Sequence, residues 1–221
     1  MDAAGGESEH FGRLLIIVTL SFIISAFSAR WASTAVALLN GVLVVTAFRS
    51  TGLRGALPRR PLLFGLTLIA AVAVVVRAIA DEQSTSQAVA SFLQAGVLCF
   101  VIIALLRAIL RHEVVTVQTI IGAVAAYVLI GLTFSWIFLG IDTLDDSQLS
   151  LDPSEPETYP EFSFITLTTV GYGNQVPTAT FSARIAVILA IVGQIFLATF
   201  VARLVSLYGR ERRGNTTEPD T

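Results

Sequence analysis

Hydrophobic and polar positions alternate along this 221-residue chain in long blocks, not in short periods. Six apolar runs stand out, at residues 14–29, 31–48, 62–80, 88–110, 114–141 and 180–208. A helix needs about 20 apolar residues to cross ~30 Å of hydrocarbon. Most of the runs meet that length, so the pattern predicts six transmembrane helices.

The first two runs leave the number of spans open. Residues 14–48 hold one charge, Arg30, and no Gly or Pro close to it. One helix of this length would be ~52 Å long, which is too long even for a tilted span. Two helices joined by a tight turn around residues 28–33 are therefore favoured. A five-span chain would place the N-terminus outside.

Composition narrows the class of protein. Hydrophobic residues make up 54% of the chain and charged residues 14%, and the mean hydropathy is +0.77. Soluble domains carry about 25% charged residues, so an ordinary soluble enzyme domain is excluded. The net charge of −2 argues against nucleic acid as a partner. Cys99 cannot form an internal disulfide, and His112 beside Glu113 lacks a nucleophile, so no enzymatic activity is expected.

Charge sets the predicted orientation, because cytoplasmic loops carry excess Lys and Arg. Ten of the 14 arginines lie in residues 49–60, at the end of the fourth run, or after residue 202. Residues 142–161 hold seven acids and no basic residue. The pattern predicts a multi-pass protein of the cell (inner) membrane with both termini in the cytoplasm. No signal peptide is expected, because the start is not basic and no small-residue cleavage site follows the first run.

A half-length helix is predicted between the fifth and sixth runs. Thr158 and Glu161 have the spacing of a capping box, and Pro160 falls in the first turn. The helix extends to Thr168, about ten residues or ~15 Å, which is half a membrane. It would enter the bilayer and stop, with its C-terminal dipole favouring a cation near the centre.

Residues 169–173 read Thr-Val-Gly-Tyr-Gly. Non-helical backbone at membrane depth is tolerated only where it is buried in protein or lines a cavity. Two glycines two positions apart allow alternate residues to take positive φ, so that successive carbonyls point one way. Four such strands around an axis would stack rings of carbonyl oxygens that replace the water shell of a cation. The Thr169 hydroxyl would add an inner ring.

This sequence, with Thr168 before it and a Phe-rich helix before that, resembles the selectivity filter of the tetrameric potassium channels, in a six-span subunit of bacterial type. The resemblance covers residues 114–207. It implies an all-α integral membrane fold with six transmembrane helices, a re-entrant pore helix and an extended filter in a homotetrameric pore. It implies no cofactor other than K⁺ bound by the first four filter residues. The filter residues are Thr169, Val170, Gly171, Tyr172 and Gly173.

The resemblance also implies supporting roles around the filter. Many family members have Asp where this chain has Asn174, and some have Glu where it has Ile165. The carboxylate pair behind the filter is therefore absent, which affects filter inactivation and blocker binding more than selectivity. Gly193 lies where many members have a hinge glycine, and close helix packing is the alternative. Gln194 would lie near the cavity below the filter, or would form an interhelical hydrogen bond.

The remaining spans predict little voltage sensing. A sensor needs Arg at every third position of the fourth span, and this span carries Arg107 only at its inner end.

The predicted organisation has four parts. These are a cytoplasmic tail (1–13), a four-helix peripheral unit (14–110), a pore domain (114–208) and a basic, polar cytoplasmic tail (209–221). Anionic lipids are candidate partners for the inner arginines. External protons or divalent cations, membrane tension or a regulatory protein are candidate stimuli.

The sequence thus predicts a passive potassium-selective channel. Two alternatives stay open: a poorly selective cation channel, because of the altered residues around the filter, and a non-conducting modulatory membrane subunit. A potassium-uptake transporter subunit is disfavoured, because such proteins join four pore repeats in one chain and this chain has one.

Overall fold

The computed structural model describes residues 3–25, 39, 42, 70–73, 75–76, 85–111, 117–151 and 158–214. The described part is helical, apart from loops and one isolated β-bridge. Its helices are α1 (Ala3–Ser25), α4 (Thr85–Arg111), α5 (Val117–Leu144), α6 (Thr158–Leu167) and α7 (Thr180–Gly214). The predicted spans 31–48 and 62–80 lie almost entirely outside these residues.

Three helices are long and apolar enough to cross a membrane. Their candidate spans are Thr85–Leu110, Thr119–Leu144 and Thr180–Arg203. They coincide with the fourth, fifth and sixth apolar runs, so the prediction of a helical membrane protein is confirmed. The number six remains a prediction.

Two helices extend past their predicted limits. α1 begins at Ala3, so most of the segment expected as an N-terminal tail is helical, and its apolar part is Gly12–Ile24. α7 continues to Gly214, beyond the expected end at residue 208. The added residues include Arg and Glu, which are good helix formers, so the helix does not stop where the apolar run stops.

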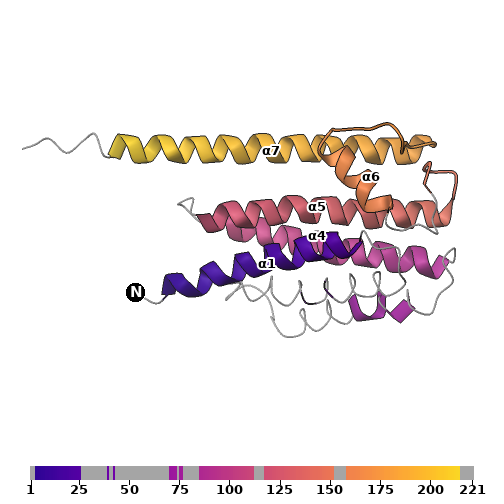
Figure 1. The fold of residues 1–221 in the computed structure, drawn as a ribbon, viewed down its shortest axis with the longest axis horizontal. Coiled ribbons are helices and arrows are strands. Elements are labelled where there is room, and N and C mark those ends of the chain that lie inside the picture. The colour runs from indigo at the N-terminus through magenta and orange to yellow at the C-terminus, as the bar shows by residue number, and fades with distance from the viewer. Residues whose placement is uncertain are drawn as a thin grey trace, which may run out of the picture.

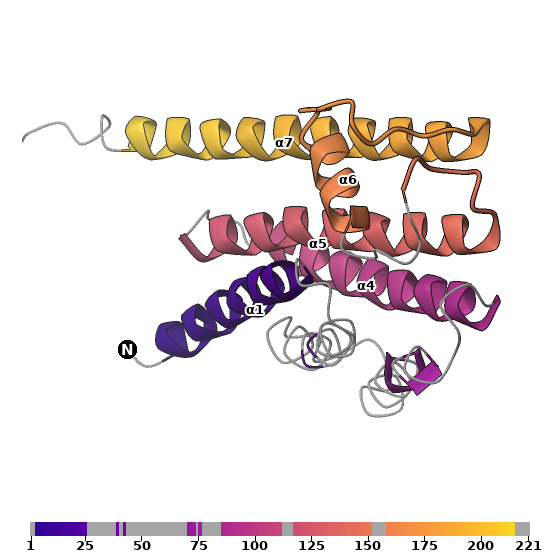
Figure 2. The ribbon, with the colours of Figure 1, turned by 45° about the vertical axis from the view of Figure 1, so that its right-hand side comes forward.

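α5 occupies the centre of the described part. Figures 1 and 2 show α1 and α4 on one side of it and α7 on the other, with the short α6 between α5 and α7. Five residues separate the end of α4 from the start of α5. Short connections join antiparallel neighbours, and α4 packs along α5.

The core lies where α1 and α4 meet α5. Leu98 and Leu105 of α4 and Leu129 and Phe138 of α5 are almost completely buried. α1 contributes a single face, with buried Leu14, Val18 and Ser21 at helical spacing. α5 is apolar around most of its circumference, which is typical of a helix enclosed by others. α5 is thus a fixed support for α6.

Candidate functional site

α6 begins at Thr158, as its capping pattern predicts, and ends at Leu167. Pro160 and Glu161 lie in its first turn, where a missing N–H and a negative charge are both favourable. Its buried residues face the chain's own helices. Phe162 packs edge-on against Phe138 of α5, with ring centroids 4.9 Å apart.

α6 approaches α5 closely at a glycine. The Ser163 hydroxyl donates a hydrogen bond to the Gly131 carbonyl at 2.7 Å. The Phe164 ring lies over the same glycine, and a Cβ atom on Gly131 would overlap that ring. The glycine therefore fixes how near the half-length helix can lie to α5.

The C-terminal end of α6 is held from two sides. The Tyr127 hydroxyl of α5 donates to the Leu167 carbonyl at 3.4 Å. Gly193 of α7 lies against the same carbonyl, and a Cβ atom there would overlap its oxygen. This contact gives Gly193 a packing function, and its role as a gating hinge remains a prediction.

The segment after α6 has an alternating backbone. Thr169, Gly171 and Gly173 have φ values of 60°, 56° and 80°. Among the described non-glycine residues, Thr169 alone has positive φ, so Val170 and Tyr172 do not share that conformation. Such alternation turns successive N–H groups to one side of the strand and the carbonyls to the other.

Hydrogen bonds show which side the N–H groups face. The amides of Val170 and Gly171 both donate to the Ile165 carbonyl, at 2.9 and 3.3 Å, and the Thr169 amide donates to the Thr166 carbonyl at 3.0 Å. These amides face α6, so the carbonyls that share their peptide planes, those of Thr168, Thr169 and Val170, point away from it. The sequence pattern pointed to the side chain of Ile165, whereas in the structure its backbone carbonyl is the group that binds the segment after α6.

Side chains at the inner end of the strand contact both neighbouring helices. The Thr168 hydroxyl donates to the Phe164 carbonyl at 2.7 Å, which keeps it on α6. The Gln194 amide of α7 lies 3.5 Å from the Thr169 hydroxyl oxygen. All five residues from Thr169 to Gly173 are exposed in the single chain. The structure thus brings Gln194 to the inner end of the predicted filter.

The outer end of the strand differs from the family pattern. Asn174 is exposed, and the described part of the chain offers it no hydrogen-bond partner. The next residue, Gln175, donates to the Glu161 carboxylate at 3.3 Å instead. This link between the start of α6 and the segment after the filter was not anticipated from the sequence.

A buried carboxylate anchors the outer end of α5. Asp142 is 0% exposed, and its two oxygens accept hydrogen bonds from the Tyr159 hydroxyl at 2.6 Å and the Leu149 amide at 3.0 Å. From the sequence, Asp142 was predicted to be one of the acids of an external loop. Two features of the sequence could have indicated its burial: Asp142 directly follows an apolar run, and a tyrosine lies at the start of α6.

At the end of α5 that is predicted to be external, two loops are joined by the outer clasp, which consists of the contacts between residues 147–150 and 176–178. The Ser150 amide donates to the Val176 carbonyl at 2.9 Å, and the Thr178 amide donates to the Gln148 carbonyl at 3.0 Å. Asp145 accepts hydrogen bonds from the Ser147 hydroxyl and the Gln148 side chain, which lower the pKa of its carboxyl group. The clasp connects the end of α5 to the segment that leaves the filter.

The chemistry offered by this site is that of neutral oxygen donors. Within the described ranges, no group of three or more His, Cys, Asp or Glu side chains could hold a metal ion. The strand instead presents backbone carbonyls and one hydroxyl. These are hard oxygen ligands without net charge, which suit a cation that exchanges its water shell for them.

Residues 158–210 match the family model described as "Ion channel". The match begins at the first residue of α6, includes the alternating strand and covers most of α7, about a quarter of the chain. Comparison with curated proteins and with solved structures gave no significant match. Together with the long apolar helices, the match supports a passive ion-channel function in a membrane protein.

Proposed function

We propose that this protein is a potassium-selective channel that conducts K⁺ passively through backbone carbonyls at residues 169–173. The observation that carries the proposal is the side to which the backbone carbonyls of this segment point. Three amides bonded to α6 leave the first carbonyls of the segment on the opposite side, and positive φ at Gly171 and Gly173 supports the same direction for those that follow. Carbonyl rings that replace the hydration shell of K⁺ are built in this way.

Four chains are proposed to share the pore. One strand supplies one oxygen at each level and cannot close a ring. α7 presents an exposed apolar stripe that includes Ile188, Ile191 and Ile195. In a membrane such a stripe can face lipid or other copies of the chain, and the ring that the filter needs, together with the closed symmetry that homo-oligomers favour, assigns it to other copies. The resemblance to tetrameric channels sets the number at four.

We place both termini in the cytoplasm of the cell membrane, with the outer clasp outside. Arg203 of α7 donates to the Ile109 carbonyl near the end of α4, at 3.2 Å. A cation at a helix C-terminus is stabilising, so Arg203 and the end of α4 lie at the same end of the chain, which is the end proposed to be cytoplasmic. Arg107 is exposed on α4 and marks the same side, where anionic lipids are the candidate partners. One arginine within the fourth span leaves little charge for voltage sensing.

Two alternatives belong to the same test. Asn174 has no described partner and Ile165 carries no carboxylate, which favours a poorly selective cation channel as the second candidate. A non-conducting subunit of the same architecture is the third. The K⁺ to Na⁺ flux ratio separates the first two, and flux without any partner protein excludes the third.

The experiment is flux of K⁺ and Na⁺ into liposomes that contain the purified chain, compared with Gly171→Ala. At Gly171 φ is +56°, and a Cβ atom would meet nothing within 4 Å. The substitution therefore acts through the backbone, where left-handed φ costs an L-residue about 1–2 kcal/mol. We expect K⁺-selective flux that falls at least tenfold in Gly171→Ala, because the strain of one strand alone corresponds to about a factor of ten and four strands line the pore.

The matched control is Gly96→Ala, in α4, where a Cβ atom also meets nothing within 4 Å and the backbone is helical. It should leave the flux unchanged. Equal K⁺ and Na⁺ flux would support the poorly selective channel. No flux from an intact oligomer would support the non-conducting subunit.

A further inference from the structure

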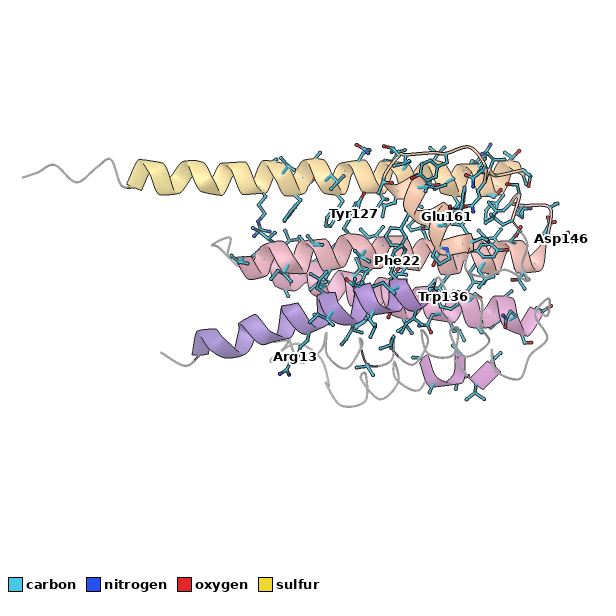
Figure 3. All side chains as sticks on the ribbon, in the orientation of Figure 1. Arg13, Phe22, Tyr127, Trp136, Asp146 and Glu161 are labelled. Carbon is cyan, nitrogen blue, oxygen red and sulfur yellow. The ribbon has the colours of Figure 1, made fainter. Side chains whose placement is uncertain are left out.

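α1 makes a direct contact with the helix behind the filter. The ring of Phe22, one turn before the end of α1, packs edge-on against the ring of Phe164 of α6. Their centroids are 4.6 Å apart and their planes are inclined by 61°. Figure 3 shows Phe22 near the end of α1, beside α5 and facing α6. This contact joins the first helix of the chain to the pore helix.

Phe164 is linked to the filter through the backbone of α6. Its ring lies on Gly131 of α5, so it is held between α5 and Phe22. Its backbone carbonyl accepts both hydrogen bonds from Thr168, from the amide at 2.9 Å and from the hydroxyl at 2.7 Å. The next carbonyl, that of Ile165, accepts the amides of two filter residues.

The packing of α1 on α5 holds Phe22 in place. α1 has 23 residues and is therefore about 35 Å long. Leu14, Val18 and Ser21 form the buried face of α1, which packs along α5. Phe22 directly follows this face, so α1 keeps its ring against Phe164.

We propose that Phe22 is a positioning residue for the selectivity filter and that α1, through it, sets the K⁺ affinity of the filter. The proposal rests on the proposed function. Aromatic pairs in this geometry are favoured beyond the area they bury, because the edge of one ring meets the face of the other. Loss of the pair removes the contact between α1 and the Phe164 ring. α6 is then held less firmly, and the hydrogen bonds from the filter amides to the α6 carbonyls weaken.

The test uses the full-length protein in detergent and in liposomes, with Phe22→Ala and the control Ile23→Ala. Ile23 is the next residue of α1, and its apolar side chain is 52% exposed. Thermal unfolding is followed as K⁺ replaces Na⁺ at constant ionic strength, because an ion bound by the folded state raises its melting temperature. The readout is the K⁺ concentration that gives half of this stabilisation.

We expect Phe22→Ala to raise that concentration about twofold to tenfold, the range that an aromatic pair spans, and to lower the K⁺ to Na⁺ flux ratio. Ile23→Ala should change neither. Phe164→Leu should act in the same direction. The double variant should add less than the sum of its parts, because the two rings form one contact.

The inference is overturned if Phe22→Ala behaves like Ile23→Ala. A melting temperature that falls equally in K⁺ and Na⁺, with the half-stabilising concentration unchanged, overturns it as well, since that is a structural role alone. If Phe22→Ala does not fold, Phe22→Leu keeps most of the volume without the ring, and the same shift is expected on a smaller scale.

The thermal readout is independent of conduction. K⁺-specific stabilisation without flux in the unaltered protein would refute the proposed channel, and the effect of Phe22→Ala would still decide the inference. Absence of K⁺-specific stabilisation would refute both.

Discussion

α5 and α7 are both long apolar helices that touch the half-length helix between them, yet their surroundings differ. In the most apolar window of α5, 72% of the residues are buried within the chain, against 17% in α7. α5 is enclosed by α1, α4 and α6, whereas α7 contacts mainly the end of α6. Most of α5 is thus covered by its own chain, whereas most of α7 is not.

The two helices accordingly make different contributions to the site. α5 supplies a scaffold, with a buried carboxylate at its outer end and a glycine under Phe164. α7 supplies a glycine beneath the end of α6, an amide near Thr169 and an exposed apolar stripe. Changes in α5 should therefore act first on folding, and changes in α7 first on conduction and assembly.

The largest effect should come from Asp142→Ala at the end of α5. The substitution leaves two buried donors, the Tyr159 hydroxyl and the Leu149 amide, without an acceptor. Each costs about 1–3 kcal/mol when unpartnered. We expect a strong loss of folded protein, measured as a lower midpoint of thermal unfolding in detergent.

Asp146→Ala is the control for this change. Asp146 is exposed in the loop that follows, and surface substitutions of this kind stay within about 0.5 kcal/mol. Equal destabilisation by the two variants would mean that the Asp142 anchor does not hold the outer end of α5.

A smaller effect should distinguish the two glycines that receive α6. Gly193→Ala would overlap a backbone oxygen of Leu167, and Gly131→Ala would overlap the Phe164 ring, a side chain whose displacement needs no backbone shift. Overpacking typically lowers the free energy of unfolding by ~1–3 kcal/mol. Gly193→Ala should lie at the upper end of this range, because it meets backbone. We expect Gly193→Ala to reduce K⁺ flux more than Gly131→Ala, measured in liposomes at equal protein content. The reverse order would show that α5 and not α7 controls the end of the pore helix.

The smallest effect concerns pH at the outer clasp. Hydrogen bonds from Ser147 and Gln148 lower the pKa of Asp145, so its ionised form stabilises the fold at pH values above ~3.9, the pKa of an unfolded aspartate. This contribution is lost as pH falls through the lowered pKa of the folded state. Because Asp145 is exposed, the loss should be slight.

The measurement is the melting temperature of the protein and of Asp145→Asn between about pH 6 and pH 3. We expect the difference between them to shrink toward the acid end. A difference that is constant with pH would mean that the carboxylate charge has no part in the clasp.

Much of this arrangement could be predicted from the sequence because it depends on long runs and local signals. The fourth to sixth apolar runs, the start of α6 at Thr158 and the start of α7 at Thr180 appear where length and capping place them. The glycines at 171 and 173 indicated where φ would be positive, and the structure adds Thr169 between α6 and the strand.

The contacts that position the strand could not be predicted, because they depend on which surfaces meet. Hydropathy assigned Asp142 to the loop, whereas partners far along the chain make its burial favourable. The pattern of side chains gives no sign that the Ile165 carbonyl accepts hydrogen bonds from two later amides. The contact of Phe22 with Phe164 joins residues 142 positions apart, beyond any local rule.

The exposed stripe of α7 has a consequence for biosynthesis. α7 is the last of the described helices to leave the ribosome, after α1, α4 and α5 have emerged. The surface proposed for assembly is therefore made after the helices that complete the chain's own core. A nascent chain released before α7 would lack this surface. Truncated chains should therefore not assemble with intact chains and inactivate the pore they share.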